Sequence, residues 1–245
     1  MQEIGQVLEI WRYPVSSVSG QMLRTVEVSP AGVAGDRRFG LFERASGRPA
    51  APEQEPKWRP ALHLCAEQCD KALPTLSIPG SAPLPLDHPS LAGRLTDYFG
   101  FEVDIAAHDG PAGGADWLFP IIPGRYVVSP LHLVTTASLS ALSTATGLNS
   151  VDRRRFRPSI LIETNQEGYV ENDWLGQALR IGTIDVSVSE RTRRCGMTLV
   201  SQPGIDEEPN VLRGIMRHNA RSLGVYANPL GSGAISVGDP VYAGI

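Results

Sequence analysis

Short runs of alternating apolar and polar residues dominate the hydrophobic pattern of the chain. Glycine and proline, with 25 and 20 residues, separate these runs along the whole sequence. Such punctuation predicts many strands joined by tight turns. The predicted strands are Gln6–Arg12, Met22–Val28, Arg38–Phe42, Ala61–Ala66, Glu102–Ala106, Ser159–Thr164, Leu179–Ile181, Ile184–Ser189 and Ile235–Val237.

Helical periodicity is confined to three segments, which are residues 90–100, 136–147 and 206–219. Ser90 is the expected cap of the first helix, and Gly147 is the expected end of the second. In the third, Asp206 is the expected cap and Pro209 lies in the first turn. The expected buried face of the first helix consists of Leu91, Leu95 and either Tyr98 or Phe99. The expected buried face of the third helix consists of Val211, Leu212, Ile215 and Met216.

Strands outnumber helices in this pattern, which predicts a mixed α/β fold class dominated by β-structure. We expect a β-barrel with attached helices and a smaller, β-rich N-terminal domain. The glycine-rich stretch HDGPAGGADW, residues 108–117, is the best candidate for a linker or mobile loop. The expected domains are therefore residues 1–105 and 106–245.

Composition limits the class of protein. The chain has 245 residues and a net charge of −4, which argues against nucleic acid or an anionic membrane as the main partner. Its N-terminus lacks the pattern of a signal peptide, and no window approaches the roughly 18 apolar residues of a membrane span. Three cysteines do not make a disulfide framework. We expect a soluble, cytoplasmic protein with reduced thiols.

One cysteine follows a cluster of positive charge in the stretch RTRRCGMT. Arg191, Arg193 and Arg194 precede Cys195 at the end of a predicted strand. Neighbouring arginines stabilise a thiolate, which is the reactive and metal-binding form of cysteine. The alternative is a structural cysteine at a strand end with solvated arginines. In HLCAEQC, Cys65 and Cys69 lack a second ligand pair with zinc-like spacing, and we expect core or surface residues there.

Two further arginine motifs suggest an anion-binding site. GDRRFGLFE places Arg37 and Arg38 after a turn, and RRRFRPSILIE places Arg157 just before a strand. Guanidinium groups at such positions can clamp an anion or a phosphate. The alternative is a simple turn whose arginines pair with nearby acids. Ser17 and Ser129 add hydroxyl groups near loop ends.

Together these motifs resemble those of a known family. WRYPVSS, GDRRFGLF, QEP, SPLHLVTTASL, FRPSILIE, ENDWLGQALRIG, RRCGMT and ISVGDPVY occur in the order and spacing of the MOSC (molybdenum-cofactor sulfurase C-terminal domain) family with its N-terminal β-barrel domain. The resemblance covers nearly the whole chain. It looks closest to bacterial relatives of the mitochondrial amidoxime-reducing component.

The resemblance implies a molybdenum cofactor (molybdopterin with Mo) and assigns residues to it. Cys195 matches the cysteine that binds molybdenum, which suits a thiophilic metal. The residues that match or adjoin the pterin-binding positions are Ser17, Arg37, Arg38, Ser129, Arg157, Arg193 and Arg194. The chain departs from the family where Ser16 replaces a common lysine, where Val127 and Val128 replace polar residues, and where Arg193 replaces a small residue.

Three functions are compatible with this resemblance. The first is a molybdenum-dependent oxidoreductase that reduces small N-hydroxylated substrates. Its electrons would come from a separate protein of the ferredoxin, flavodoxin or flavin reductase type. The second is a sulfurtransferase with a Cys195 persulfide, and the third is a non-catalytic cofactor carrier. Binding of pyridoxal phosphate, which is also associated with the family, is not expected here.

Overall fold

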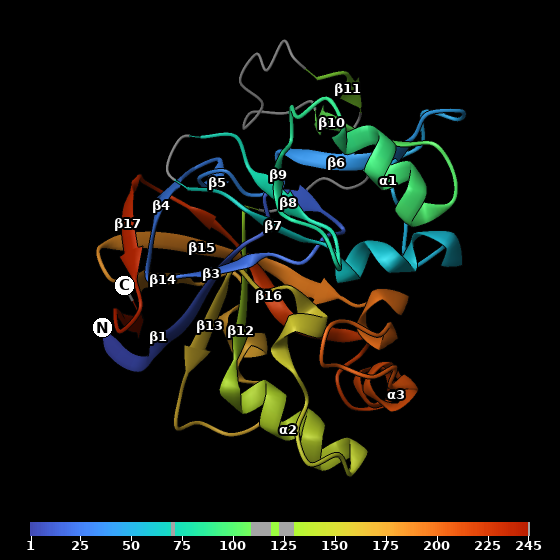
Figure 1. Ribbon diagram of the computed structural model, residues 1–245. Helices are drawn as coiled ribbons and strands as arrows, with labels where there is room; N and C mark the ends of the chain where they lie inside the picture. Colours follow the sequence, from blue (N-terminus) through green and yellow to red (C-terminus); the bar gives the residue numbers. More distant parts are fainter. Residues whose placement is uncertain (70–71, 109–118, 123–129, 245) are drawn as a thin grey trace.

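The computed structural model describes residues 1–69, 72–108, 119–122 and 130–244, and its centre is a closed β-barrel (Figure 1). Seven strands follow one another in the order β13-β12-β16-β15-β14-β18-β1, and β1 closes the barrel by pairing with β13. Their bounds are β1 Gln2–Arg12, β12 Leu131–Thr135, β13 Ile160–Glu163, β14 Ala178–Ile181, β15 Ile184–Arg193, β16 Ser222–Pro229 and β18 Pro240–Ala243. This architecture confirms the predicted fold class.

Apolar side chains that alternate with polar ones along the strands fill the inside of the barrel. Val7 and Ile10 of β1 and Val186 and Val188 of β15 are fully buried in one apolar cluster. Burial of each such side chain contributes roughly 1.5–3 kcal/mol. The short strand β3, Gln21–Leu23, pairs with the end of β1 and extends the sheet beyond the closed ring.

A second apolar cluster lies outside the barrel, in the N-terminal half of the chain. Its largest sheet has the order β11-β10-β6-β2 and packs with α1 around Trp58, which is fully buried (top of Figure 1). The three-stranded sheet β7-β8-β9 also belongs to this half, whereas the three-stranded sheet β17-β4-β5 packs with the barrel cluster through Val26, Val28, Val33 and Ile235. The bounds are β2 Val15–Ser16, β4 Thr25–Ser29, β5 Gly32–Val33, β6 Phe39–Glu43, β7 Cys65–Glu67, β8 Thr75–Ser77, β9 Leu84–Pro85, β10 Val103–His108, β11 Ile121–Ile122, β17 Gly233–Ser236, α1 Leu91–Phe99 and the 3₁₀ helix η1 Pro56–His63.

Two helices cover one outer wall of the barrel at the opposite end of the molecule (Figure 1). Helix α2, Thr136–Thr146, begins where the Thr135 side chain accepts a hydrogen bond from Ser138 N, and it ends at Gly147 as predicted. Helix α3, Pro209–His218, packs against α2, and a Cβ added to Gly214 would lie 2.4 Å from Thr146 Cγ2. Close approach of the two helices therefore requires glycine there.

Several details of the helix predictions were wrong. Glu208, not Asp206, caps α3 by accepting a hydrogen bond from Asn210 N, because Pro209 occupies the first helical position. Met216 is 57% exposed, since Gly214 rather than Met216 completes the inner face with Val211 and Ile215. The Ser90 hydroxyl bonds the His88 ring instead of capping α1.

The strand predicted at Ala61–Ala66 was also wrong over most of its length. Residues 56–63 form η1, because Pro56 and Pro60 hold φ near −65° and favour a helical turn there; only β7 follows as a strand. None of the described helices has the length and apolarity needed to cross a membrane. The domain division after residue 105 stays a prediction, and the barrel itself includes β1 from the N-terminus.

Candidate functional site

Two guanidinium groups lie against the ring of one buried tyrosine, Tyr13, which directly follows β1. Asp36 Oδ1 accepts a 2.6 Å hydrogen bond from Tyr13 N, and the Asp36 carboxylate also pairs with Arg37. The guanidinium carbons of Arg37 and Arg157 lie 5.0 and 4.2 Å from the centre of the Tyr13 ring. Two arginines that are far apart in the sequence therefore share one aromatic platform.

The backbone is strained at the residues that the motifs identified. Ser17, Arg37 and Arg157 have φ values of 64°, 49° and 52°, in the left-handed region that favours glycine. Each such residue costs about 1–3 kcal/mol, and strain of this kind clusters at functional sites. These three are among five non-glycine residues with positive φ in the described part of the chain. The strain supports a site at the position that the motifs predict.

A buried histidine links this platform to the segment before Cys195. His132 on β12 bonds the Arg157 carbonyl oxygen through Nδ1 at 3.3 Å, and its Nε2 faces Arg194 Nη2. Arg37 Nη2 donates to the same Arg157 oxygen at 3.3 Å. Arg37, Arg157, His132 and Arg194 therefore form one continuous cluster, which we call the arginine cluster.

Burial and neighbouring charge keep His132 neutral. Burial lowers the pKa of His132 well below its usual value, and the nearby Arg194 charge lowers it further. A neutral ring has one donor and one acceptor. Because Arg194 donates to Nε2, the proton of His132 resides on Nδ1, from which it donates to the Arg157 oxygen.

The arginine cluster carries an excess of positive charge. Burial lowers the pKa values of Arg157 and Arg194 to about 10, so both remain charged near neutral pH. Burial also opposes the charge of Arg37, but Asp36, Tyr13 and Tyr226 together outweigh it and raise the pKa of Arg37. Asp36 is the only carboxylate paired with these three arginines within the described residues. The site therefore favours an anion.

Arg194 and Arg157 differ in how their donors are used. Arg194 donates to the Leu223 carbonyl oxygen at 2.6 and 3.0 Å and to the Phe156 oxygen at 3.1 Å, besides its contact with His132. Arg157 Nη2 is buried and has no hydrogen-bond partner in the described part of the chain. Arg194 is thus committed to the protein, whereas Arg157 retains a donor for a ligand.

Cys195 lies at the end of β15 beside this cluster. The backbone before it is fixed by Arg194 N, which donates to Arg221 O at 2.8 Å, and by Arg221 Nε, which donates to Arg194 O at 2.9 Å. Thr198 N and Oγ1 both donate to the Cys195 oxygen. The thiol is half-buried and unbridged, on a rigid strand end.

The other predicted site residues are more dispersed. Ser17 Oγ donates to Ala50 O at 3.4 Å, and the Arg38 guanidinium lies 5.6 Å from the Phe39 ring centre. Arg191 and Arg193 are exposed to solvent on β15. Ser129, Val127, Val128 and nearly all of the proposed linker 108–117 lie outside the described residues.

The other two cysteines, Cys65 and Cys69, are not members of the arginine cluster. Cys65 is half-buried, and burial raises its pKa; Cys69 is exposed. Within the described ranges, no group of three or more histidine, cysteine, aspartate and glutamate side chains is placed to hold a metal ion.

Sequence reasoning missed the parts of the site that depend on long-range contacts. Tyr13 and His132 lie inside the motif strings, but neither stood out as a site residue. His132 alternates with Leu131 and Leu133, both of which face the barrel interior. A histidine between two core leucines of a strand points away from the barrel interior. This position in the sequence could have identified His132 as a residue of the outer wall.

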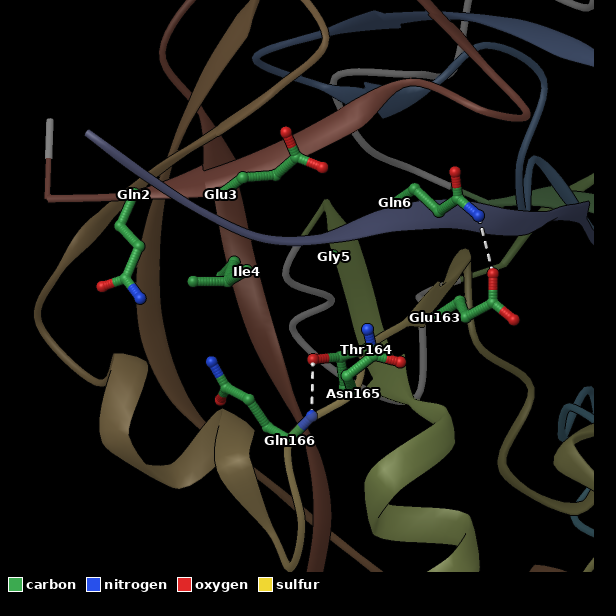
Figure 2. Close-up of a pocket in the computed structure, with 9 residues that line it drawn as sticks. All are labelled: Gln2, Glu3, Ile4, Gly5, Gln6, Glu163, Thr164, Asn165 and Gln166. Carbon is green, nitrogen blue, oxygen red and sulfur yellow. Dashed lines mark hydrogen bonds between the residues drawn. The ribbon is translucent and has the colours of Figure 1, made fainter.

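A larger hollow lies elsewhere, where β1 begins beside the end of β13 (Figure 2). It measures about 400 Å³ and includes Gly5, Gln6 and Glu163. Gln6 Nε2 donates to Glu163 at 2.7 Å, and the other side chains in Figure 2 point in different directions. Gly5 and Tyr13 are separated by roughly 25 Å along an extended strand. This hollow is therefore not part of the arginine cluster.

The neutral His132 predicts a measurable acid sensitivity. Its folded pKa is below the unfolded value of 6.5, so only the unfolded chain gains a proton as the pH falls through 6.5. Stability should therefore decrease below pH 6.5, with a slope approaching about 1.4 kcal/mol per pH unit from this residue. Urea unfolding of wild type and His132→Gln at pH 7.5, 6.5, 5.8 and 5.0 measures it. Equal pH dependence of the two proteins would contradict the assignment.

Comparison with known proteins agrees with this fold. The family model described as MOSC N-terminal beta barrel domain matches residues 4–122, and the MOSC domain matches residues 108–242. The chain belongs to the MOSC domain family, which confirms the resemblance found in its motifs. The family is associated with the molybdenum cofactor.

More specific relatives are distant. Mitochondrial amidoxime reducing component 2 of Bos taurus is 25% identical over 99% of this chain and 84% of that protein. Mitochondrial amidoxime-reducing component 1 of Homo sapiens is 25% identical with the same coverage. Among solved structures, the YUAD protein of Bacillus subtilis aligns over 98% of this chain and 94% of its own, with a TM-score of 0.51 and 9% identity. That likeness concerns the fold alone.

Proposed function

We propose that the protein is a molybdenum-cofactor-dependent oxidoreductase that reduces small N-hydroxylated compounds. The observation that carries the proposal is the arginine cluster with its unpartnered Arg157 Nη2 beside Cys195. The names of the amidoxime-reducing relatives supply the reaction class. The alternatives from the sequence, sulfur transfer and cofactor carriage, lack a specific structural observation of their own.

The described residues fit an anionic cofactor. A pterin phosphate presents oxygen acceptors, and Arg157 Nη2 is a buried donor without one. Of the three guanidinium groups, only that of Arg37 is paired with a carboxylate among the described residues. The other two leave positive charge for the phosphate to neutralise. Cys195 contributes the one soft ligand at the edge of this cluster, which suits molybdenum.

Each residue then has a distinct role. Arg157 and Arg37 would bind the phosphate, with Tyr13 holding both guanidinium groups in place. Arg194 and His132 act through the backbone oxygens of Leu223, Phe156 and Arg157, and they fix the ends of the strands that carry the site. Cys195 would hold the metal, and the bound molybdenum would supply two-electron redox chemistry.

Turnover would require a separate electron-transfer protein of the ferredoxin, flavodoxin or flavin reductase type. The exposed Arg191 and Arg193, close to Cys195 in sequence, are available for contact with an acidic partner surface.

Elemental analysis tests the proposal. Protein produced in a host with an intact molybdenum-cofactor pathway should contain close to one molybdenum per chain, because the cofactor would be held by charge-assisted bonds and a metal–thiolate bond. A metal content below about a tenth of that, with the host pathway shown to work, would contradict the oxidoreductase. A mass increase of one sulfur on Cys195 without molybdenum would instead favour sulfur transfer.

A further inference from the structure

A second, smaller cavity adjoins the arginine cluster on the side of β1 and β7. It measures about 240 Å³, which corresponds to the volume of roughly eight water molecules. Its described lining comes from the end of β1, from residues 63–65, from the 3₁₀ helix η2 (Arg153–Phe156) with Arg157, and from Gln202 and Pro203. Tyr13 and Arg157 belong to both places, whereas Ser17, Arg37 and Cys195 are absent from the described lining of the cavity.

Three buried polar atoms in this lining have no hydrogen-bond partner within the described residues. They are the Tyr13 hydroxyl, Arg157 Nη2 and Gln202 Nε2. Tyr13 and Gln202 are only 3% and 6% exposed, so solvent satisfies neither side chain directly. A buried polar atom without a partner costs about 1–3 kcal/mol, and three around one cavity indicate a common ligand.

The three atoms specify an acceptor with negative charge. Arg157 and Gln202 offer N–H donors, and burial raises the pKa of Tyr13, which keeps its hydroxyl protonated and able to donate. The described lining contains no carboxylate. Arg154, the other arginine there, is already paired with Asp152 at 2.7 Å and with the Pro203 oxygen. The charge of Arg157 therefore remains for a ligand.

Apart from Ser19, His63 and Cys65, the rest of the wall is apolar and partly aromatic. Trp11 lies nearly parallel to Tyr13, with ring centres 6.3 Å apart and an interplanar angle of 15°. Leu64 and Pro203 add apolar surface. Such a wall favours a flat, apolar body attached to the anionic group.

We propose that this cavity, which adjoins the cofactor site, is a binding site for a small aromatic carboxylate. The carboxylate oxygens accept hydrogen bonds from Arg157, Gln202 and Tyr13, and the ring lies along Trp11. The site shares Tyr13 and Arg157 with the proposed cofactor site, whereas Gln202 and Trp11 belong to this cavity alone. Its test therefore uses cofactor-free protein, in which no phosphate occupies Arg157.

Calorimetric titration of the isolated full chain tests the site. Benzoate is the probe, benzamide is its neutral counterpart, and inorganic phosphate is an anion without a ring. We expect one benzoate per chain, with at least tenfold weaker binding of benzamide and phosphate, because each lacks either the charge or the apolar body. Heat signals absent up to 20 mM benzoate, or phosphate binding equal to that of benzoate, would overturn the proposal.

Variants locate the bound probe. Tyr13→Phe keeps the ring and removes the hydroxyl, and Gln202→Met keeps the length and removes the amide, so each should weaken benzoate binding about tenfold. Arg37→Gln changes a residue of the cofactor site that is absent from the described lining of the cavity, so it is the matched control and should bind benzoate as wild type does. Thermal unfolding verifies that all three fold. Loss of binding in Arg37→Gln with full binding in the other two would place benzoate in the cofactor site and refute the cavity.

Discussion

Replacement of Cys195 by serine is expected to abolish reductase activity, by at least about 100-fold. The two side chains are nearly isosteric, and the backbone of Cys195 is fixed by Arg221 and Thr198 rather than by the thiol, so folding should survive. A serine hydroxyl stays protonated near neutral pH and is a hard oxygen ligand, which makes it a poor substitute for thiolate at a soft metal. Reduction of benzamidoxime by viologen-reduced protein measures the effect.

The other two cysteines provide the controls. Cys65 is half-buried beside Gly20 and Cys69 is exposed, both outside the arginine cluster. Cys65→Ser and Cys69→Ser should keep most of the activity. An active Cys195→Ser enzyme would refute the metal-ligand role, and the thiol would then be a structural residue at a strand end.

The barrel could be predicted from alternation because most of its strands have one face inside and one face outside. Strand β12 escaped prediction for a physical reason. Leu131 and Leu133 fill the barrel, while His132 and Val134 face a wall that α2 and α3 cover, so every residue from 131 to 135 is buried. A strand buried on both faces loses the alternating pattern. Strand β16 escaped for a related reason, since Leu223 packs outside and Val225 inside.

The candidate site shows a different limit. The family resemblance assigned Arg157 and Arg194 to the same cofactor site, through the FRP and RRC motifs. Their donors have different partners: Arg194 is held by Leu223, Phe156 and His132, which are 29 or more positions away along the chain. Partners at such separation leave no local pattern in the sequence.

The backbone partners of Arg194 also bear on how the arginines are arranged around Cys195. From the sequence, at least one guanidinium should lie beside the sulfur. In the structure the Arg194 guanidinium donates to backbone oxygens and still interacts with Cys195 through its charge, whereas Arg191 and Arg193 extend into solvent. The RTRR segment therefore positions the strand end at least as much as it charges the thiol.

Arg157→Met and Arg194→Met should have opposite consequences. The first removes a buried donor that has no protein partner, so stability should be unchanged or slightly higher, whereas cofactor affinity should fall about ten- to a hundredfold through the loss of roughly 1.5–3 kcal/mol. The second leaves Leu223 O, Phe156 O and His132 without a donor and should cost at least about 3 kcal/mol of unfolding free energy. Molybdenum content after extensive dialysis and the urea unfolding midpoint measure the two effects. Full cofactor occupancy in Arg157→Met, or equal stability losses in both variants, would show that the unpartnered donor of Arg157 does not serve the cofactor.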